Sequence, residues 1–101
     1  MKKVIKFQFD GKEGFLSIVE KPSFYYTLVK KDTDKVASIR ETHQLMISYE
    51  LKPLQFVPVA VSVVEDPAVI QEVYHQLEQD KNLYFKVLDD SLIALKIAKE
   101  N

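Results

Sequence analysis

The chain has 101 residues, which is enough for one hydrophobic core, and we expect residues 1–101 to form a single domain. Its composition, 47% hydrophobic and 29% charged, is typical of a globular protein and excludes a disordered one. The 14 basic and 15 acidic residues give a net charge of −1, which argues against nucleic acid as a partner because phosphate binding needs a basic surface. Since the chain has no cysteine, its stability must come from packing, a ligand or a partner subunit.

The first residues, Met1–Lys6, are basic but lack the apolar run of a signal peptide. No other stretch is long and apolar enough to span a membrane. We therefore expect a cytoplasmic protein that makes no membrane contact.

The first third of the chain predicts three strands. Ile5, Phe7 and Phe9 alternate with polar residues, as in a half-buried strand. Asp10–Gly14 is a predicted hairpin loop, because Asp-Gly readily adopts positive φ. The three strands are expected at residues 4–9, 15–19 and 24–29, with a second turn at 21–23.

The period then changes to that of a helix. Val36, Ile39, Arg40 and His43 follow the i, i+3, i+4, i+7 spacing and predict a helix over residues 34–42. Its N-cap is Asp32, Thr33 or Asp34. A fourth strand is expected within residues 44–50. A fifth is expected over residues 54–65, where Pro58 indicates a sheet edge or a bulge.

Asp66-Pro67 predicts the start of a second helix, with aspartate as the N-cap and proline at the first helical position. Val69, Val73 and Leu77 form its apolar stripe, and it should end near Asp80. Two final strands are expected at residues 83–87 and 92–98. The expected order is β-β-β-α-β-β-α-β-β, a mainly β (α+β) antiparallel sheet curled into a small barrel with two short helices.

The sequence contains no recognisable catalytic constellation. His43 and His75 are assigned to different helices and lack spaced partners, so we expect no metal site. Asp89-Asp90 is interpreted as a turn and not as an acid/base pair. No phosphate-binding glycine loop or nucleophile elbow is present.

The segment from Tyr26 to Lys35 combines three lysines and two threonines where a strand leads into a helix. Helix N-terminal amides and nearby ammonium groups can hold a phosphate. Lys35 lies in the first helical turn, where a cation opposes the helix dipole unless an anion is near. The alternative is a solvated turn whose negative charge comes from Asp32 and Asp34.

The order of these segments resembles the FMN-binding split-barrel family, also called pyridoxamine 5'-phosphate oxidase-like. Similarity lies in an aromatic strand, a threonine-containing turn with a lysine, a short helix, and a long strand that runs into an acidic helix start. The residues that carry it are 24–27, 33–40, 45–50, 57–66 and 84–97.

The resemblance implies a split β-barrel that forms a homodimer with FMN at each end of the subunit interface. It implies that Lys30, Lys31, Thr33 and Lys35 hold the phosphate, with Arg40 as a further candidate. The implied function is that of a small flavoprotein, an oxidoreductase that passes electrons to a small molecule. The alternative is a cofactor-free relative that acts as a small-molecule or protein-binding module.

Overall fold

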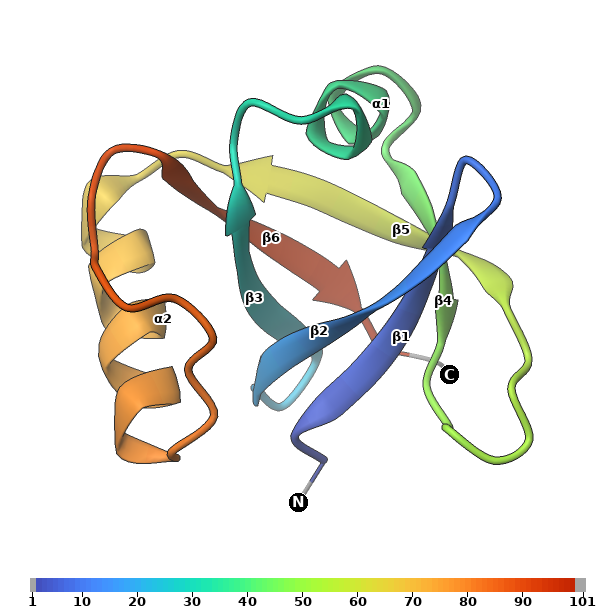
Figure 1. The fold of residues 1–101 in the computed structure, drawn as a ribbon, viewed down its shortest axis with the longest axis horizontal. Helices are drawn as coiled ribbons and strands as arrows, with labels where there is room; N and C mark the ends of the chain where they lie inside the picture. The colour runs from blue at the N-terminus through green and yellow to red at the C-terminus, as the bar shows by residue number, and fades with distance from the viewer. Residues whose placement is uncertain (1, 100–101) are drawn as a thin grey trace.

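The computed structural model describes residues 2–99 and contains a closed antiparallel barrel of six strands with two helices (Figure 1). Around the barrel the strands follow the order β1-β2-β3-β6-β5-β4. The mainly β barrel with two helices that the sequence predicts is confirmed. In chain order the elements are β1 Val4–Phe9, β2 Lys12–Glu20, β3 Phe24–Lys30, α1 Asp34–Thr42, β4 Gln44–Ser48, β5 Val57–Val64, α2 Pro67–Gln79 and β6 Leu92–Ala98.

The turn between β1 and β2 is tighter than the sequence suggests. Asp10 and Gly11 have φ of 52° and 74°, and positive φ at both positions is what a two-residue hairpin turn requires. The strands therefore pair up to Phe9 and Lys12, and β2 begins three residues before the predicted Phe15.

Both helices begin where the sequence predicts. Of the three candidate caps of α1, Thr33 is the one whose side chain accepts a hydrogen bond from the Val36 amide. The Asp66 carboxylate accepts one from the Ala68 amide at 2.9 Å, and Pro67 is the first residue of α2. His43 lies outside the helix to which it was assigned, since it terminates α1 with a φ of 57°.

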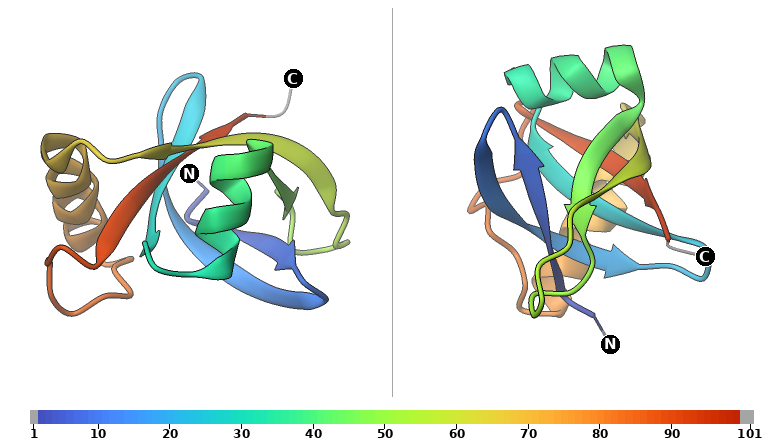
Figure 2. Two further views of the ribbon diagram at one scale, coloured as in Figure 1. Left: turned by 90° about the horizontal axis from the view of Figure 1, so that it is seen from above. Right: turned by 90° about the vertical axis from the view of Figure 1, so that its right-hand side faces the viewer.

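The two helices cover different parts of the barrel (Figure 2). Helix α1 crosses one end and buries Val36 and Ile39 in the barrel core. Helix α2 packs against the outer wall, where Val73, Tyr74 and Leu77 meet apolar side chains of β2, β3 and β6. Neither helix within residues 2–99 has the length and apolar character needed to cross a membrane.

The strand predicted at residues 83–87 is wrong. Residues 82–91 form an irregular connecting segment, so the observed order is β-β-β-α-β-β-α-β. Six strands already close the barrel, and residues 82–91 add no seventh strand to it. Two of the apolar residues that suggested a strand, Leu83 and Phe85, pack instead on the cluster around α2, as does the neighbouring Leu88.

Pro58 occupies the edge position that its missing amide hydrogen requires. It lies opposite Met46 of β4, whereas pairing of β5 with β6 begins only at Val61. On the side that faces β6, Pro58 therefore has no strand partner, and its missing amide hydrogen breaks no ladder there. The expectation of an edge is confirmed.

Strands β2 and β3 separate after only three paired positions. Their ladder runs from Glu20–Tyr25 to Ile18–Thr27. Before Ile18, β2 pairs only with β1, and beyond Thr27, β3 pairs only with β6. Thr27 is 1% exposed, and its hydroxyl donates a hydrogen bond of 2.6 Å to the Ser17 carbonyl oxygen, at the point where the strands part.

We expect Thr27→Val to lower the free energy of unfolding by about 1–3 kcal/mol, because it removes the hydroxyl of a buried residue and leaves the part-buried Ser17 carbonyl without this donor. Urea denaturation measures the change. Thr42→Val is the control: it removes an exposed hydroxyl at the end of α1 and should cost less than about 0.5 kcal/mol. Equal losses in the two variants would mean that the Thr27 hydroxyl has no special role at the separation point.

Candidate functional site

A groove occupies the space that opens where β2 and β3 separate. Its volume is about 540 Å³, within the range of small-molecule sites. Residues of β1 and β2 form one wall, the connecting segment forms the other, and the start of α1 closes one end. Its aromatic lining is Phe7, Phe15, Tyr84 and Phe85, its aliphatic lining Leu16, Leu28, Val29 and Leu77, and its polar lining Ser17, Lys30, Thr33 and Lys35.

The groove is positively charged although the chain as a whole is nearly neutral. Lys30 and Lys35 line it, and no carboxylate within residues 2–99 does. The arrangement is suited to a ligand that carries both an anionic group and a flat apolar group, because cations and aromatic faces are present together.

Lys35 lines the groove without an ion-pair partner among residues 2–99, although it shares a neighbouring hollow with Asp10, Glu13 and Asp34. Its ammonium nitrogen lies 4.2 Å from the centroid of the Phe7 ring, over the face of the ring. Among the described residues, no carboxylate lies within ion-pair distance of it. Burial lowers the pKa of Lys35 below the usual lysine value. An anion in the groove would offset this desolvation of the charged form.

Lys30 and Thr33 reach the same groove but already have partners. The Lys30 ammonium donates to the Ser91 hydroxyl at 2.9 Å and lies 5.5 Å from the Phe85 ring centroid. The Thr33 hydroxyl donates to the Lys30 carbonyl and accepts from the Val36 amide, both at 3.3 Å. Thr33 thus fixes the strand-to-helix turn from which Lys35 extends.

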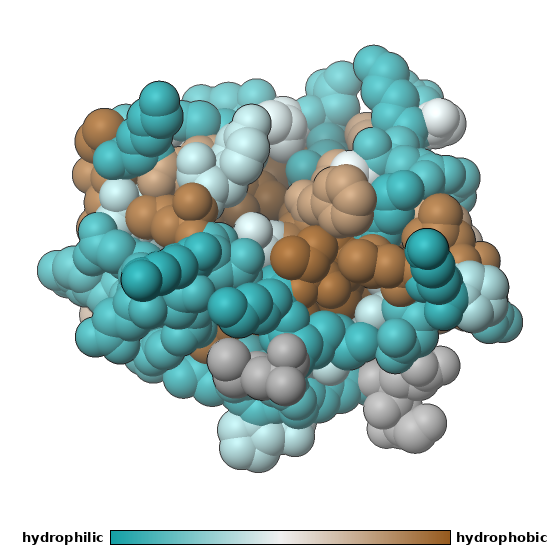
Figure 3. All heavy atoms as spheres, turned by 60° about the horizontal axis from the view of Figure 1, so that its bottom comes forward, coloured by the Kyte–Doolittle hydropathy of each residue, from teal (hydrophilic) through white to brown (hydrophobic). Residues whose placement is uncertain are grey.

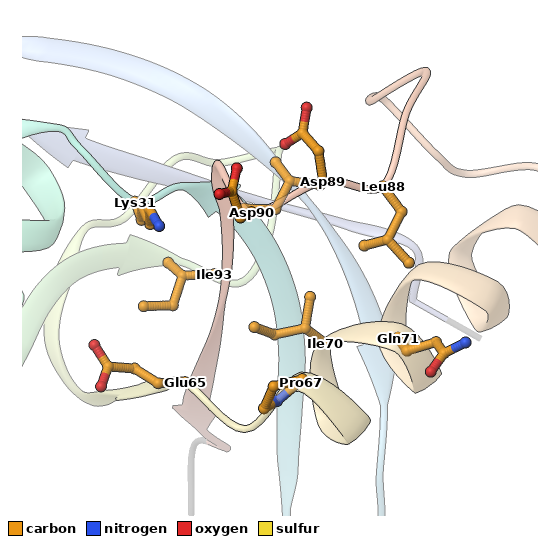
Figure 4. A pocket seen from close by; sticks show the side chains of 10 residues that line it. Lys31, Glu65, Pro67, Ile70, Gln71, Leu88, Asp89, Asp90 and Ile93 are labelled. Carbon is orange, nitrogen blue, oxygen red and sulfur yellow. The ribbon is translucent and has the colours of Figure 1, made fainter.

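The other two predicted residues lie elsewhere. Lys31 lines a second hollow of about 610 Å³, in which Glu65, Asp89 and Asp90 surround an apolar floor (Figure 4). The Arg40 guanidinium is 2.6 Å from the Glu65 carboxylate. An anion at either position would meet nearby carboxylates, so the structure brings Lys30, Thr33 and Lys35 together and leaves Lys31 and Arg40 apart.

The aromatic lining of the groove is what the sequence analysis missed. Phe15 is 64% exposed and Tyr84 is 82% exposed, unusually open for such large side chains. On the face drawn in Figure 3, apolar atoms reach the surface with hydrophilic atoms around them. The available signal was Phe15, an apolar residue on the outward side of a strand whose inward residues are Leu16 and Ile18.

The site contains no metal-binding group. Among residues 2–99 no three histidine, cysteine or carboxylate side chains are placed to hold an ion. The His75 imidazole lies on α2, 3.7 Å from the Glu78 carboxylate, whereas His43 terminates α1. The two histidines are therefore associated with different helices and do not share a set of ligands.

Comparison with known proteins identifies the fold. No protein-family model matches the chain, and no curated protein sequence matches it. Its structure is similar to the crystal structure of a Listeria innocua protein that is provisionally named a pyridoxamine 5'-phosphate oxidase. The TM-score is 0.62 at 15% sequence identity, and the match covers 97% of this chain and 82% of that one. The split-barrel fold suggested by the order of the sequence segments is therefore confirmed.

We expect Lys35→Met to leave the ligand-free protein about as stable as the wild type at neutral pH. The variant is stabilised by removal of a desolvated charge that also opposes the α1 dipole. It is destabilised by loss of the contact between the ammonium and the Phe7 ring. Because the folded-state pKa of Lys35 is lowered, the unfolded chain binds more protons between that pKa and the ordinary lysine value. The wild type should therefore gain stability relative to Lys35→Met as pH rises through this interval.

Chemical denaturation at several alkaline pH values tests this expectation. Lys12→Met, at an exposed position of the β1–β2 hairpin, is the control and should show no such trend. A wild type that loses stability relative to Lys35→Met with rising pH would contradict the lowered pKa.

Proposed function

We propose that the protein binds FMN in this groove as a small flavoprotein of the pyridoxamine 5'-phosphate oxidase-like type. The observation that carries the proposal is the combination, in one groove, of two lysines and four aromatic rings, with no carboxylate of residues 2–99 in the lining. The residues fit the cofactor, since a flavin nucleotide has a flat apolar ring at one end and a dianionic phosphate at the other.

In this proposal Lys35 is the main phosphate-binding residue. Its ammonium has an aromatic ring but no carboxylate as partner within residues 2–99, so phosphate would bind it without breaking an ion pair. Lys30 would add a second positive charge, and Thr33 would hold the turn so that the first amides of α1 face the same anion.

The flavin ring would lie against the aromatic side chains at the groove wall. Phe15 and Tyr84 are the most exposed of these, and a flat ring placed on them would remove apolar area from water. FMN would supply the electron-transfer chemistry when bound, while these residues bind it, orient it and exclude water.

We further propose that the protein is a homodimer in which a second copy covers part of this surface. The exposed apolar side chains Phe15, Tyr84 and Val87, at 64%, 82% and 63%, provide area for such an interface. Sedimentation at micromolar concentration should give a species of twice the 11.7 kDa chain mass. A single species at the chain mass would contradict the dimer.

One observation favours the alternative of a cofactor-free binding module. Two of the four polar residues that line the groove, Lys30 and Thr33, already have side-chain partners in the chain. In that case the groove would take an apolar or weakly anionic small molecule, and purified protein would lack flavin absorbance.

Titration with FMN and with riboflavin tests the proposal. A charge-assisted contact contributes about 1.5–3 kcal/mol, so Lys35→Ala should weaken FMN about tenfold to a hundredfold. Riboflavin, which lacks the phosphate, should bind the variant and the wild type about equally. Lys31→Ala is the matched control: it removes a lysine from the neighbouring hollow and should change FMN affinity little.

Absence of FMN binding to the wild type would contradict the proposal. Equal weakening of riboflavin and FMN by Lys35→Ala would mean that the lysine serves the ring or the fold and that the phosphate lies elsewhere.

A further inference from the structure

Gly14, Phe7 and Lys35 form a stack at the end of the groove. Phe7 and Gly14 are directly opposite each other in the β1–β2 ladder. The Lys35 ammonium lies on the Phe7 ring at 4.2 Å from its centroid. The glycine, the ring and the cation come from three different elements, and all three residues line the groove.

The position of the ring depends on the missing side chain of Gly14. A Cβ atom at residue 14 would lie 2.7 Å from two carbons at the far edge of the Phe7 ring, closer than real Cβ contacts. Gly14 does not have the positive φ that favours glycine, so space for the ring accounts for a glycine there. Gly11 is the opposite case, with a φ of 74° and open space around its Cβ position.

The ring in turn determines where the ammonium lies. Phe7 is half-buried and packs against the barrel core, with its ring at the end of the groove. A cation is attracted to the face of an aromatic ring and not to its edge. A methyl group at residue 14 would displace the ring, and the Lys35 ammonium would follow it or lose the contact.

We infer that Gly14 is a positioning residue: by leaving room for the Phe7 ring, it places the Lys35 ammonium in the groove and thereby sets the preference of the site for phosphate-bearing ligands. The identity of the ligand rests on the proposed function, whereas the placement of Lys35 does not. Lys30 is independent of this stack, because it is held by Ser91 and lies near Phe85.

The test uses Gly14→Ala with two companions. Phe7→Leu keeps the glycine but removes the ring. It replaces Gly14→Ala in the test if that variant does not fold. Gly11→Asn is the matched control in the same hairpin, because asparagine tolerates positive φ and no atom lies near that Cβ position.

The first measurement is the proton NMR shift of the Lys35 side-chain methylene next to the ammonium, in ligand-free protein. A ring face 4.2 Å away should move this signal upfield in the wild type and in Gly11→Asn. The displacement should be reduced or lost in Gly14→Ala and in Phe7→Leu. An unchanged signal in Gly14→Ala overturns the inference, whatever the protein binds.

The second measurement is the ratio of FMN to riboflavin affinity. Gly14→Ala should lower this ratio roughly threefold to tenfold, the size of a partly desolvated cation–ring contact. Combined with Lys35→Ala it should add little further loss, since both changes act on one ammonium. Equal weakening of both ligands, or full additivity, contradicts the inference. If the wild type binds no FMN, the proposed function fails, and the NMR measurement alone decides the placement of Lys35.

Discussion

The groove depends on the point at which β2 and β3 stop pairing. At that point the Thr27 hydroxyl donates a hydrogen bond to the Ser17 carbonyl oxygen. A ladder that ends inside a barrel leaves backbone groups without partners, which is costly where water is excluded. Thr27, 1% exposed, supplies the missing donor from its side chain. Beyond this point β2 pairs with β1 and β3 pairs with β6, so the groove opens between two strands that no longer share a ladder.

The net charge of −1 does not show how the basic residues are distributed between ion pairs and the groove. Several basic residues are neutralised by carboxylates elsewhere, for example Lys6 by Glu13 at 3.0 Å and Arg40 by Glu65 at 2.6 Å. The groove lysines are instead held by aromatic rings and a hydroxyl. A ring stabilises an ammonium without neutralising it, and no carboxylate of residues 2–99 lines the groove itself. The carboxylates nearest the two lysines lie outside it: Asp10, Glu13 and Asp34 share a neighbouring hollow with Lys35, and Asp89 interacts with Lys30. This is the electrostatic basis for expecting an anion there and not in the second hollow.

Local sequence signals predicted the fold well because they are physical causes of its elements. The Asp66-Pro67 cap, the helical spacing from Val36 and the alternation of Ile5, Phe7 and Phe9 act within a few residues. The predicted strand at residues 83–87 failed because Leu83 and Phe85 are partly buried against the cluster around α2 and do not pair in a strand ladder, a tertiary contact that local composition does not distinguish from strand pairing. The aromatic wall of the groove was missed for a related reason. It exists only because β2 and β3 separate, and nothing local to Phe15 or Tyr84 encodes that separation.

The lysines that are neighbours in the sequence are not the ones that share a groove. Lys30 is the last residue of β3 and Lys31 lies in the bend that follows, and the two adjacent side chains line different hollows. Lys35 lines the same groove as Lys30, from the first turn of α1, whose N-terminus Thr33 caps. The relevant pair is therefore five positions apart and joined by a turn. The proposed anion site needs a backbone that directs two ammonium groups into one space, and here Thr33 and the end of β3 place Lys30 and Lys35 in one groove.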